Sequence, residues 1–182
     1  MFKYKNNNLN NMQHFPLVER LHTDILEEKY GHITSKVLRH DTIREAHLVD
    51  SKGISRTYAI TFLNKSYNRE IIKINKKIKN GNPIGKAFRE YDYAIRKNVL
   101  DVFKIKIPIW LKKSFQVNDN YAKARLSEFY AKRRDHEPVI YGIVVEIYSP
   151  DFRKPKINSV DKSQISSVTE CLEKYGFTKD EI

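Results

Sequence analysis

Residues 138–150 read Pro-Val-Ile-Tyr-Gly-Ile-Val-Val-Glu-Ile-Tyr-Ser-Pro, and this stretch decides the fold. Between its two prolines, almost every residue is β-branched or aromatic, the exceptions being Gly142, Glu146 and Ser149, and this composition is typical of a β-strand. Because side chains alternate between the two faces of a strand, this pattern makes both faces apolar. Such a strand is expected at the centre of a sheet, with other elements covering both of its faces.

Glu146 is the one charged residue in this stretch. Burying a carboxylate costs several kcal/mol unless the group is paired, hydrogen-bonded or protonated, so we expect a partner for it, in part a ligand. Arg44 is the other charge that falls among apolar residues of a predicted strand. Two interpretations stay open. The two residues form a structural ion pair between neighbouring strands, or they share a cavity in which Arg44 receives a carboxylate and Glu146 handles a hydroxyl group or a proton.

The chain on both sides of this stretch predicts further strands. Residues 122–134 are expected to pair with residues 138–148 as a hairpin, and residues 95–107 form a long strand that ends at 108–111. One side of the long strand is expected to carry Val99, Asp101, Phe103, Ile105 and Ile107. Residues 43–50 and 56–63 form a strand pair around a turn that contains Gly53.

Helices are predicted at residues 15–30, at 34–39 with Thr34 as the cap, and at 66–79 with Ser66 as the cap. Residues 80–85 are either a plain helix stop or a loop that wraps a ligand, and residues 86–89 form a short turn. A last helix opens at Asp161 and stops at Gly176. This order of elements predicts an α+β domain, in which helices pack on an antiparallel β-sheet of about six strands.

The composition is that of one globular domain. The 182 residues divide into a polar tail expected to be disordered (1–14), a domain (15–152) and a C-terminal extension with one helix (153–182). No apolar run reaches the roughly 18 residues of a membrane span, and no signal core follows Met1, so we expect a cytoplasmic protein. The single cysteine, Cys171, excludes an internal disulfide, and the six histidines have no metal-binding spacing, so no metal is expected. The net charge is +12, but the lysines are scattered over every segment, so nucleic acid is not the partner we expect.

Four segments follow one another in an order that resembles a known enzyme family. They are Arg44-Glu-Ala-His-Leu, Tyr58-Ala-Ile-Thr-Phe-Leu, Asn82-Pro-Ile-Gly-Lys-Ala-Phe and Val144-Val-Glu-Ile-Tyr-Ser-Pro. Together they resemble the chorismate pyruvate-lyase family over residues 31–152, and residues 95–111 look like the branch found in archaea and mycobacteria. The resemblance implies a six-stranded antiparallel sheet and a buried site closed by flaps. It also implies elimination of pyruvate from chorismate to give 4-hydroxybenzoate, without metal or cofactor, which in methanogens would feed a pterin-type coenzyme.

The resemblance also implies roles for individual residues. Arg44 matches the arginine that holds the ring carboxylate, and Glu146 matches the glutamate near the ring hydroxyl. The other matched positions are Ile84, whose backbone would contact the ligand, Lys86 in the same loop, Ile33 in a flap, and the small residue Ala59 in the pocket wall. Chorismate is a dianion, which suits a guanidinium group and a basic protein. Elimination needs one proton delivered to the leaving group and one removed from the ring, and burial is expected to raise the pKa of Glu146 for this task.

The sequence departs from the family pattern at two places. Relatives carry an additional strand before the Arg-Glu strand, whereas residues 32–41 run almost directly into Arg44. Either that strand is absent, or Arg44 lies on a different strand of the pair. A second basic position is displaced, and Arg133 or Arg134 is expected to replace it. The alternatives to a lyase are a non-catalytic domain that binds an aromatic carboxylate, and a basic protein that binds nucleic acid.

Overall fold

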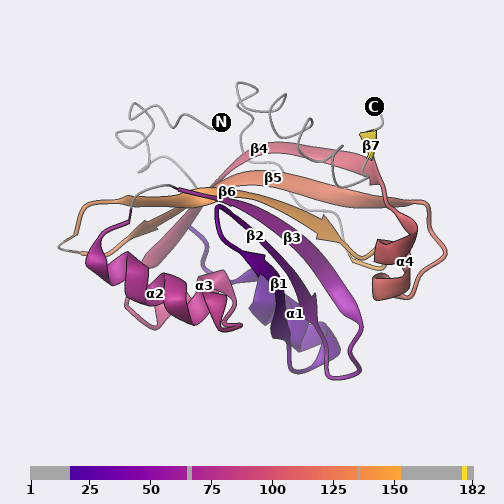
Figure 1. The fold of residues 1–182 in the computed structure, drawn as a ribbon, viewed down its shortest axis with the longest axis horizontal. Coiled ribbons are helices and arrows are strands. Elements are labelled where there is room, and N and C mark those ends of the chain that lie inside the picture. Colours follow the sequence, from indigo (N-terminus) through magenta and orange to yellow (C-terminus); the bar gives the residue numbers. More distant parts are fainter. Residues whose placement is uncertain (1–16, 65–66, 135, 153–177, 180–182) are drawn as a thin grey trace.

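The structure is a computed structural model that describes residues 17–64, 67–134, 136–152 and 178–179. Among these residues, seven strands form one antiparallel sheet in the order β1-β2-β3-β6-β5-β4-β7, together with four helices (Figure 1). The strands are β1 (Thr34–His40), β2 (Ile43–Val49), β3 (Ser55–Leu63), β4 (Ala94–Lys106), β5 (Tyr121–Lys132), β6 (Val139–Tyr148) and β7 (Thr178–Lys179). The helices are α1 (His22–Tyr30), α2 (Arg69–Lys79), α3 (Ile84–Arg89) and α4 (Ile109–Phe115). The predicted α+β class is confirmed.

The stretch that decides the fold lies where its pattern predicts. β6 is flanked by β3 on one side and β5 on the other, and every residue of β6 after Val139 is buried. The predicted hairpin of β5 with β6 is confirmed, as is the pair of β2 with β3 around Gly53, which has the left-handed φ of 77° that a tight turn needs.

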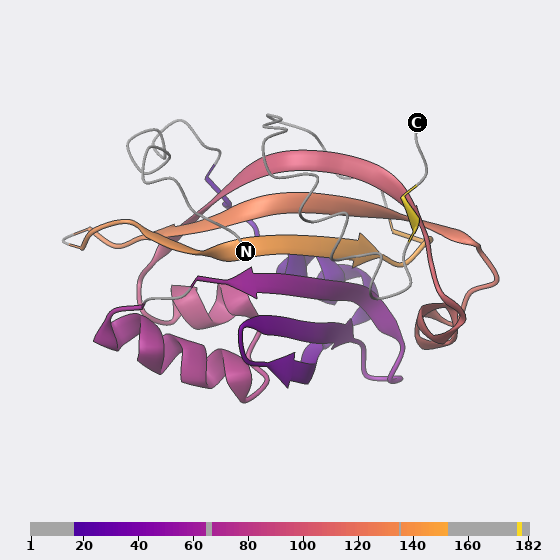
Figure 2. The ribbon, with the colours of Figure 1, turned by 45° about the horizontal axis from the view of Figure 1, so that its top comes forward.

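Each face of the sheet has its own apolar cluster. On one face, α2 and α3 pack with the segment before α1 against the sheet, through Ile71, Ile74, Ile78, Phe88 and Leu21. On the other face, α4 contributes Leu111 and Phe115 to a cluster with Ile60, Val145 and Ile147. Figures 1 and 2 show α2 and α3 toward one end of the arched sheet, and α4 at the opposite end.

Strand register places the two charges of interest on the same face. Arg44 on β2 is opposite Thr61 on β3, which is opposite Val144 on β6. Glu146 lies two residues further along β6, opposite Ala59. β2 and β6 are therefore two strands apart, which corresponds to about 10 Å between their backbones.

The short helix predicted at residues 34–39 is wrong, because this segment is β1 and pairs with β2. Here tertiary pairing outweighs a local cap signal, and Ser35 faces Leu48 across the ladder. A strand therefore does precede the Arg-Glu strand, and it is joined to β2 by a two-residue turn. The alternative in which this strand is absent is wrong.

Several element boundaries also differ from prediction. The first helix begins at His22 and not at Phe15, because the N–H of Val18 donates to the carbonyl of Ile95 and holds that segment extended. Asn68 caps α2 through a bond from Ile71, whereas the predicted cap Ser66 lies outside the described residues. A bulge after Val99 places Leu100, and not Val99, beside Phe103 and Ile105.

Residues 86–89, predicted as a turn, belong to α3, and residues 109–115 form a helix that was not predicted. The predicted tail (1–14), the last helix from Asp161 and Cys171 lie outside the described residues.

Candidate functional site

A cavity lies between the sheet and the helices α1 and α3. The volume open to the centre of a water molecule is about 70 Å³, several times the roughly 10–15 Å³ that one water needs. Most of its wall is apolar. The lining residues are Val18, Leu21, His22, Thr23, Arg44, Ala46, Leu48, Ala59, Pro83, Ile84, Gly85, Ile95, Lys97, Phe129, Val144 and Glu146. The space exists because Ala46 and Ala59, opposite each other on β2 and β3, have short side chains.

Arg44 lies at one end of the cavity as a buried cation. Its side chain donates from Nη2 to Ser35 Oγ at 2.7 Å, and its Nε is buried without a hydrogen-bond partner. Burial lowers the pKa of Arg44 to about 10, so the guanidinium stays charged at neutral pH. No carboxylate of the described part of the chain forms an ion pair with it, so its charge is available to a bound anion.

Thr61 has a second unpartnered polar atom at this end of the face. It is directly opposite Arg44 in the register of β2 and β3, and its buried Oγ1 has no hydrogen-bond partner. Buried polar atoms are rarely left unpaired in native proteins, so each such atom requires an explanation. Of these two opposed residues, Arg44 lines the cavity and Thr61 is not among the lining residues.

Glu146 lies at the other end and is fully neutralised. Lys97 Nζ donates to its Oε1 at 2.8 Å, while Oε2 accepts from Arg125 Nη2 at 2.6 Å and from the Tyr148 hydroxyl at 3.0 Å. The structural ion pair between Arg44 and Glu146 is therefore not formed. Arg44 and Glu146 line one cavity instead, and each forms hydrogen bonds with different partners.

The electrostatics of Glu146 correct one expectation. Burial alone would raise the pKa of this carboxyl, but Lys97 and Arg125 together outweigh burial and hold it well below its usual value. Glu146 is thus a carboxylate at neutral pH, and the expected raised pKa is wrong. Burial lowers the pKa of Lys97, although the charge of Glu146 offsets part of this effect.

His22, at the start of α1, closes this end of the cavity. Its Nε2 lies 2.7 Å from Thr57 Oγ1, and its ring meets Tyr148 edge to face at 5.2 Å between centroids. Burial lowers the pKa of His22 to about 4; the charge of Glu146 opposes this shift, and Lys97 and Arg125 add to it. The imidazole is therefore neutral at pH 7 and acts as a hydrogen-bonding group.

The structure brings together four of the six predicted site residues. Arg44, Ala59, Ile84 and Glu146 all line the cavity. Ile33 and Lys86 do not line it, because both bind Glu27 on α1. The Ile33 N–H donates to the Glu27 carboxylate at 3.3 Å, and Lys86 Nζ lies 2.7 Å from both of its oxygens.

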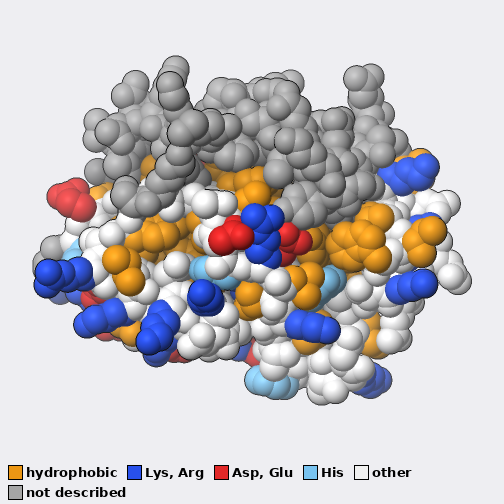
Figure 3. Space-filling model, viewed as in Figure 1, with side chains coloured by type: hydrophobic (Ala, Val, Ile, Leu, Met, Phe, Trp, Pro, Cys, Tyr) orange, Lys and Arg blue, Asp and Glu red, His pale blue; other side chains and the backbone are white. Residues whose placement is uncertain are grey.

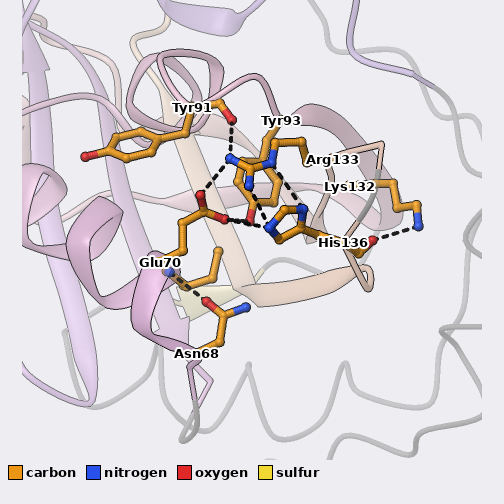
Figure 4. Close-up of polar contacts among 8 residues, drawn as sticks. Asn68, Glu70, Tyr91, Tyr93, Lys132, Arg133 and His136 are labelled. Carbon is orange, nitrogen blue, oxygen red and sulfur yellow. Dashed lines mark hydrogen bonds and ion pairs between the residues drawn. The ribbon is translucent and has the colours of Figure 1, made fainter.

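Arg133, expected as a replacement for the second basic position, serves another purpose. Figure 4 shows its guanidinium between Glu70 and His136, and its Nη1 donates to Glu70 Oε1 at 2.6 Å. The Tyr93 hydroxyl donates to the other oxygen of Glu70 at 2.5 Å. This cluster joins the β5–β6 hairpin to α2, and Arg125 is the basic residue of β5 that reaches Glu146.

Lys97, Arg125 and His22 were missed from the sequence. Lys97 carried a usable signal, because it alternates with Ile95 and Val99 on one side of a strand, as Glu146 does with its own neighbours. Arg125 alternates with Lys123 and Ser127 on its side of β5, so no apolar neighbours in the sequence indicated that it is buried. His22 fell within the predicted helix at residues 15–30, and its position against Tyr148 of β6 depends on tertiary packing alone.

Comparison with known proteins adds no identification. No family model matches the chain, and no curated protein is significantly similar to it in sequence. Within the described residues, no cluster of three or more His, Cys, Asp or Glu side chains is placed to hold a metal ion. No helix in that same part of the chain is long and apolar enough to cross a membrane.

Proposed function

We propose that this protein is a chorismate lyase, which eliminates pyruvate from chorismate to give 4-hydroxybenzoate. The observation that carries the proposal is the charge distribution of the cavity. Arg44 is a buried guanidinium with an unpaired Nε, and no carboxylate in the described ranges pairs with it. A buried charge of this kind is costly to the protein unless a ligand neutralises it.

The cavity suits a ligand with two negative charges. At the Glu146 end, Lys97 and Arg125 face one carboxylate, which leaves one net positive charge there. Arg44 supplies another at the opposite end, so a dianion with an anionic group at each end is neutralised by the site. Chorismate has a carboxylate on its ring and a second on its enolpyruvyl group, and the apolar wall between the two ends suits the ring.

The test is the reaction itself. Purified protein is incubated with chorismate, and 4-hydroxybenzoate and pyruvate are both quantified. We expect equal amounts of the two products from the wild-type protein and a loss of at least about 100-fold in kcat/KM with Arg44→Ala, whose ion pair to the ligand is broken. Glu146→Gln should lose a similar factor. Arg39→Met, at an exposed arginine of β1 next to Asp41, is the matched control and should react at the wild-type rate.

A folded wild-type protein that forms neither product would reject the lyase proposal. One observation favours a second candidate, because Glu146 already accepts hydrogen bonds from Lys97, Arg125 and Tyr148, as a purely structural carboxylate would. Tight binding of 4-hydroxybenzoate without turnover would therefore support a non-catalytic domain for aromatic carboxylates.

The nucleic-acid alternative has less support. The blue side chains in Figure 3 are spread around the visible face and do not form one continuous stripe. A nucleic-acid binder needs a continuous basic surface that follows the phosphate backbone, with steep salt dependence of binding.

A further inference from the structure

Lys97 and Glu146 form a hydrogen-bonded pair of opposite charge inside the cavity. The two side chains come from β4 and β6, which are separated by β5, and both line the cavity wall. Their side chains are 14% and 8% exposed, and the Nζ to Oε1 distance is 2.8 Å. A ligand in this cavity therefore contacts an ammonium group and a carboxylate at the same end, within reach of neighbouring atoms of its ring.

The two carboxylate oxygens of Glu146 accept hydrogen bonds from different donors. Oε2 accepts from Arg125 Nε and Nη2 and from the Tyr148 hydroxyl, so it is fully occupied. Oε1 accepts only from Lys97 among the described donors, and a carboxylate oxygen accepts two hydrogen bonds. Oε1 is thus the oxygen that retains capacity to accept a proton.

Among the three donors to Glu146, Lys97 is the one suited to release a proton. Arginine does not give up its proton in proteins, and burial raises the pKa of Tyr148 well above its usual value. Burial has the opposite effect on the ammonium of Lys97, whose pKa it lowers.

Resting on the lyase function proposed above, we propose that Glu146 is the general base and Lys97 the general acid of the elimination, and that their hydrogen bond restores both groups after each turnover. Glu146 Oε1 takes the hydrogen of the ring carbon that bears the hydroxyl group. The electrons of that C–H bond form the last double bond of the aromatic ring, and the neighbouring C–O bond to the enolpyruvyl group breaks.

Lys97 donates a proton to the departing oxygen, which leaves as enolpyruvate and becomes pyruvate by tautomerisation. The pair is then neutral, with Glu146 protonated and Lys97 an amine. Passage of the proton from Oε1 to Nζ along their hydrogen bond restores the ion pair. The atoms balance as chorismate to 4-hydroxybenzoate and pyruvate, with no net proton taken from solvent.

The test separates proton donation from charge. Lys97→Arg keeps the positive charge, but a guanidinium does not release its proton. We therefore expect the Kd for 4-hydroxybenzoate to stay within about threefold of wild type while kcat falls about 100-fold to 10,000-fold. Lys104→Arg, at an exposed position of the same strand, is the matched control and should keep the wild-type kcat. Retained binding shows that the cavity of the variant is formed. A Lys97→Arg protein with wild-type kcat would overturn the assignment.

A label gives a second test on the wild-type protein, which does not depend on the folding of any variant. Chorismate carrying deuterium on the ring carbon that bears the hydroxyl group is converted in ordinary water. Because the deuterium passes to Glu146 and then to the exchangeable protons of Lys97, pyruvate without deuterium is expected. A stoichiometric deuterium in the pyruvate methyl group would show direct transfer within the substrate and reject the pair. Wild-type protein that forms no product rejects the lyase proposal itself, whereas product with either contrary result rejects only the Lys97–Glu146 pair.

Discussion

Arg44 and Glu146 bear opposite charges in one cavity, and their surroundings treat the two charges differently. Glu146 accepts hydrogen bonds from two cationic side chains and a tyrosine hydroxyl, so its negative charge is balanced within the fold. Arg44 donates one hydrogen bond to a serine hydroxyl, and its Nε has no hydrogen-bond partner. Residues that a fold leaves unbalanced are candidates for function, because selection for stability alone would pair or replace them.

Thr61 allows this argument to be tested without touching a charge. Thr61→Val removes a buried hydroxyl that has no partner, so the free energy of unfolding should stay within about 1 kcal/mol of wild type or rise. If the hydroxyl donates to a bound carboxylate beside Arg44, the affinity for 4-hydroxybenzoate should fall about 10-fold to 100-fold, measured by titration calorimetry.

Ser127→Ala is the matched control for Thr61→Val. Ser127 also has a buried unpartnered hydroxyl on this face, but Val144 of β6 lies between it and Thr61. Equal loss of affinity in both variants would argue against a carboxylate site at Arg44.

Glu146 makes the stability of the protein depend on pH in a defined window. Its pKa in the folded protein is well below the value of 4.5 expected for the unfolded chain. The stabilisation is therefore complete above pH 4.5 and is lost as the pH falls through the folded pKa. Glu146→Gln should lower the free energy of unfolding by about 3–5 kcal/mol at pH 7, because Lys97 and Arg125 are left without a counter-charge.

Urea unfolding at several pH values measures this difference, which should shrink below pH 4.5. Glu90→Gln, in an exposed pair with Lys77, should change the free energy of unfolding by about 0–1 kcal/mol. A Glu146→Gln difference that stays constant down to pH 2.5 would contradict the role of the ionised carboxylate.

The sequence predicted that Glu146 needs partners but not which ones. Lys97 and Arg125 are 49 and 21 residues away along the chain, and only the register of β4, β5 and β6 places them beside Glu146. The same limit explains why the predicted rise in the pKa of Glu146 was wrong. Burial can be predicted from apolar neighbours in the sequence, whereas two approaching cations cannot.

At the scale of the elements, periodicity predicted strands well where both neighbours are strands. β2, β3, β4, β5 and β6 were all predicted, since apolar residues recur at every second position over part of each strand. β1 was mistaken for a helix because its exposed edge position leaves its pattern polar, with Ser35 as its one buried residue. α3 and α4 are short, and contacts with the sheet through Phe88 and Phe115 stabilise them more than any local signal does.

Gly142 is the position where β6 depends most on a missing side chain. A Cβ there would lie 2.4 Å from the carbonyl oxygen of Phe62, which is backbone of β3 and cannot move without separating the strands. Gly142→Ala should therefore lower the free energy of unfolding by about 3 kcal/mol, the upper end of the cost of overpacking.

Gly85→Ala provides the contrast, measured in the same chemical unfolding experiment. Its Cβ would lie 2.6 Å from Leu21 Cδ2, the end of a side chain that can turn aside. Because Leu21 lines the cavity, this variant should keep its stability within about 1 kcal/mol but bind 4-hydroxybenzoate more weakly. If Gly142→Ala proved as stable as Gly85→Ala, the close approach of β3 and β6 would be wrong.

At the scale of the whole molecule, the two faces of the sheet differ in what they contain. The face covered by α4 has a continuous apolar cluster, whereas the face covered by α1, α2 and α3 contains the cavity and its charges. The fold class was predictable because it follows from the order of strands and helices. The cavity was not, since it depends on Ala46, Ala59 and Gly85 meeting from three different elements.

The net charge of +12 belongs to the molecule and not to the site, and it predicts how an anion arrives. Attraction between a basic protein and an anion acts through water and is screened by salt, with a Debye length of about 30 Å at 0.01 M and 3 Å at 1 M. The association rate constant of 4-hydroxybenzoate should therefore fall severalfold between these salt concentrations.

The dissociation rate constant should respond differently, because it depends on a buried guanidinium that salt screens weakly. Stopped-flow measurements over that salt range separate the two constants. The uncharged methyl ester of 4-hydroxybenzoate is the control, and its association should not depend on salt. If the dissociation rate constant rose as steeply as the association rate constant fell, the anion would be held by exposed lysines and not by Arg44 in the cavity.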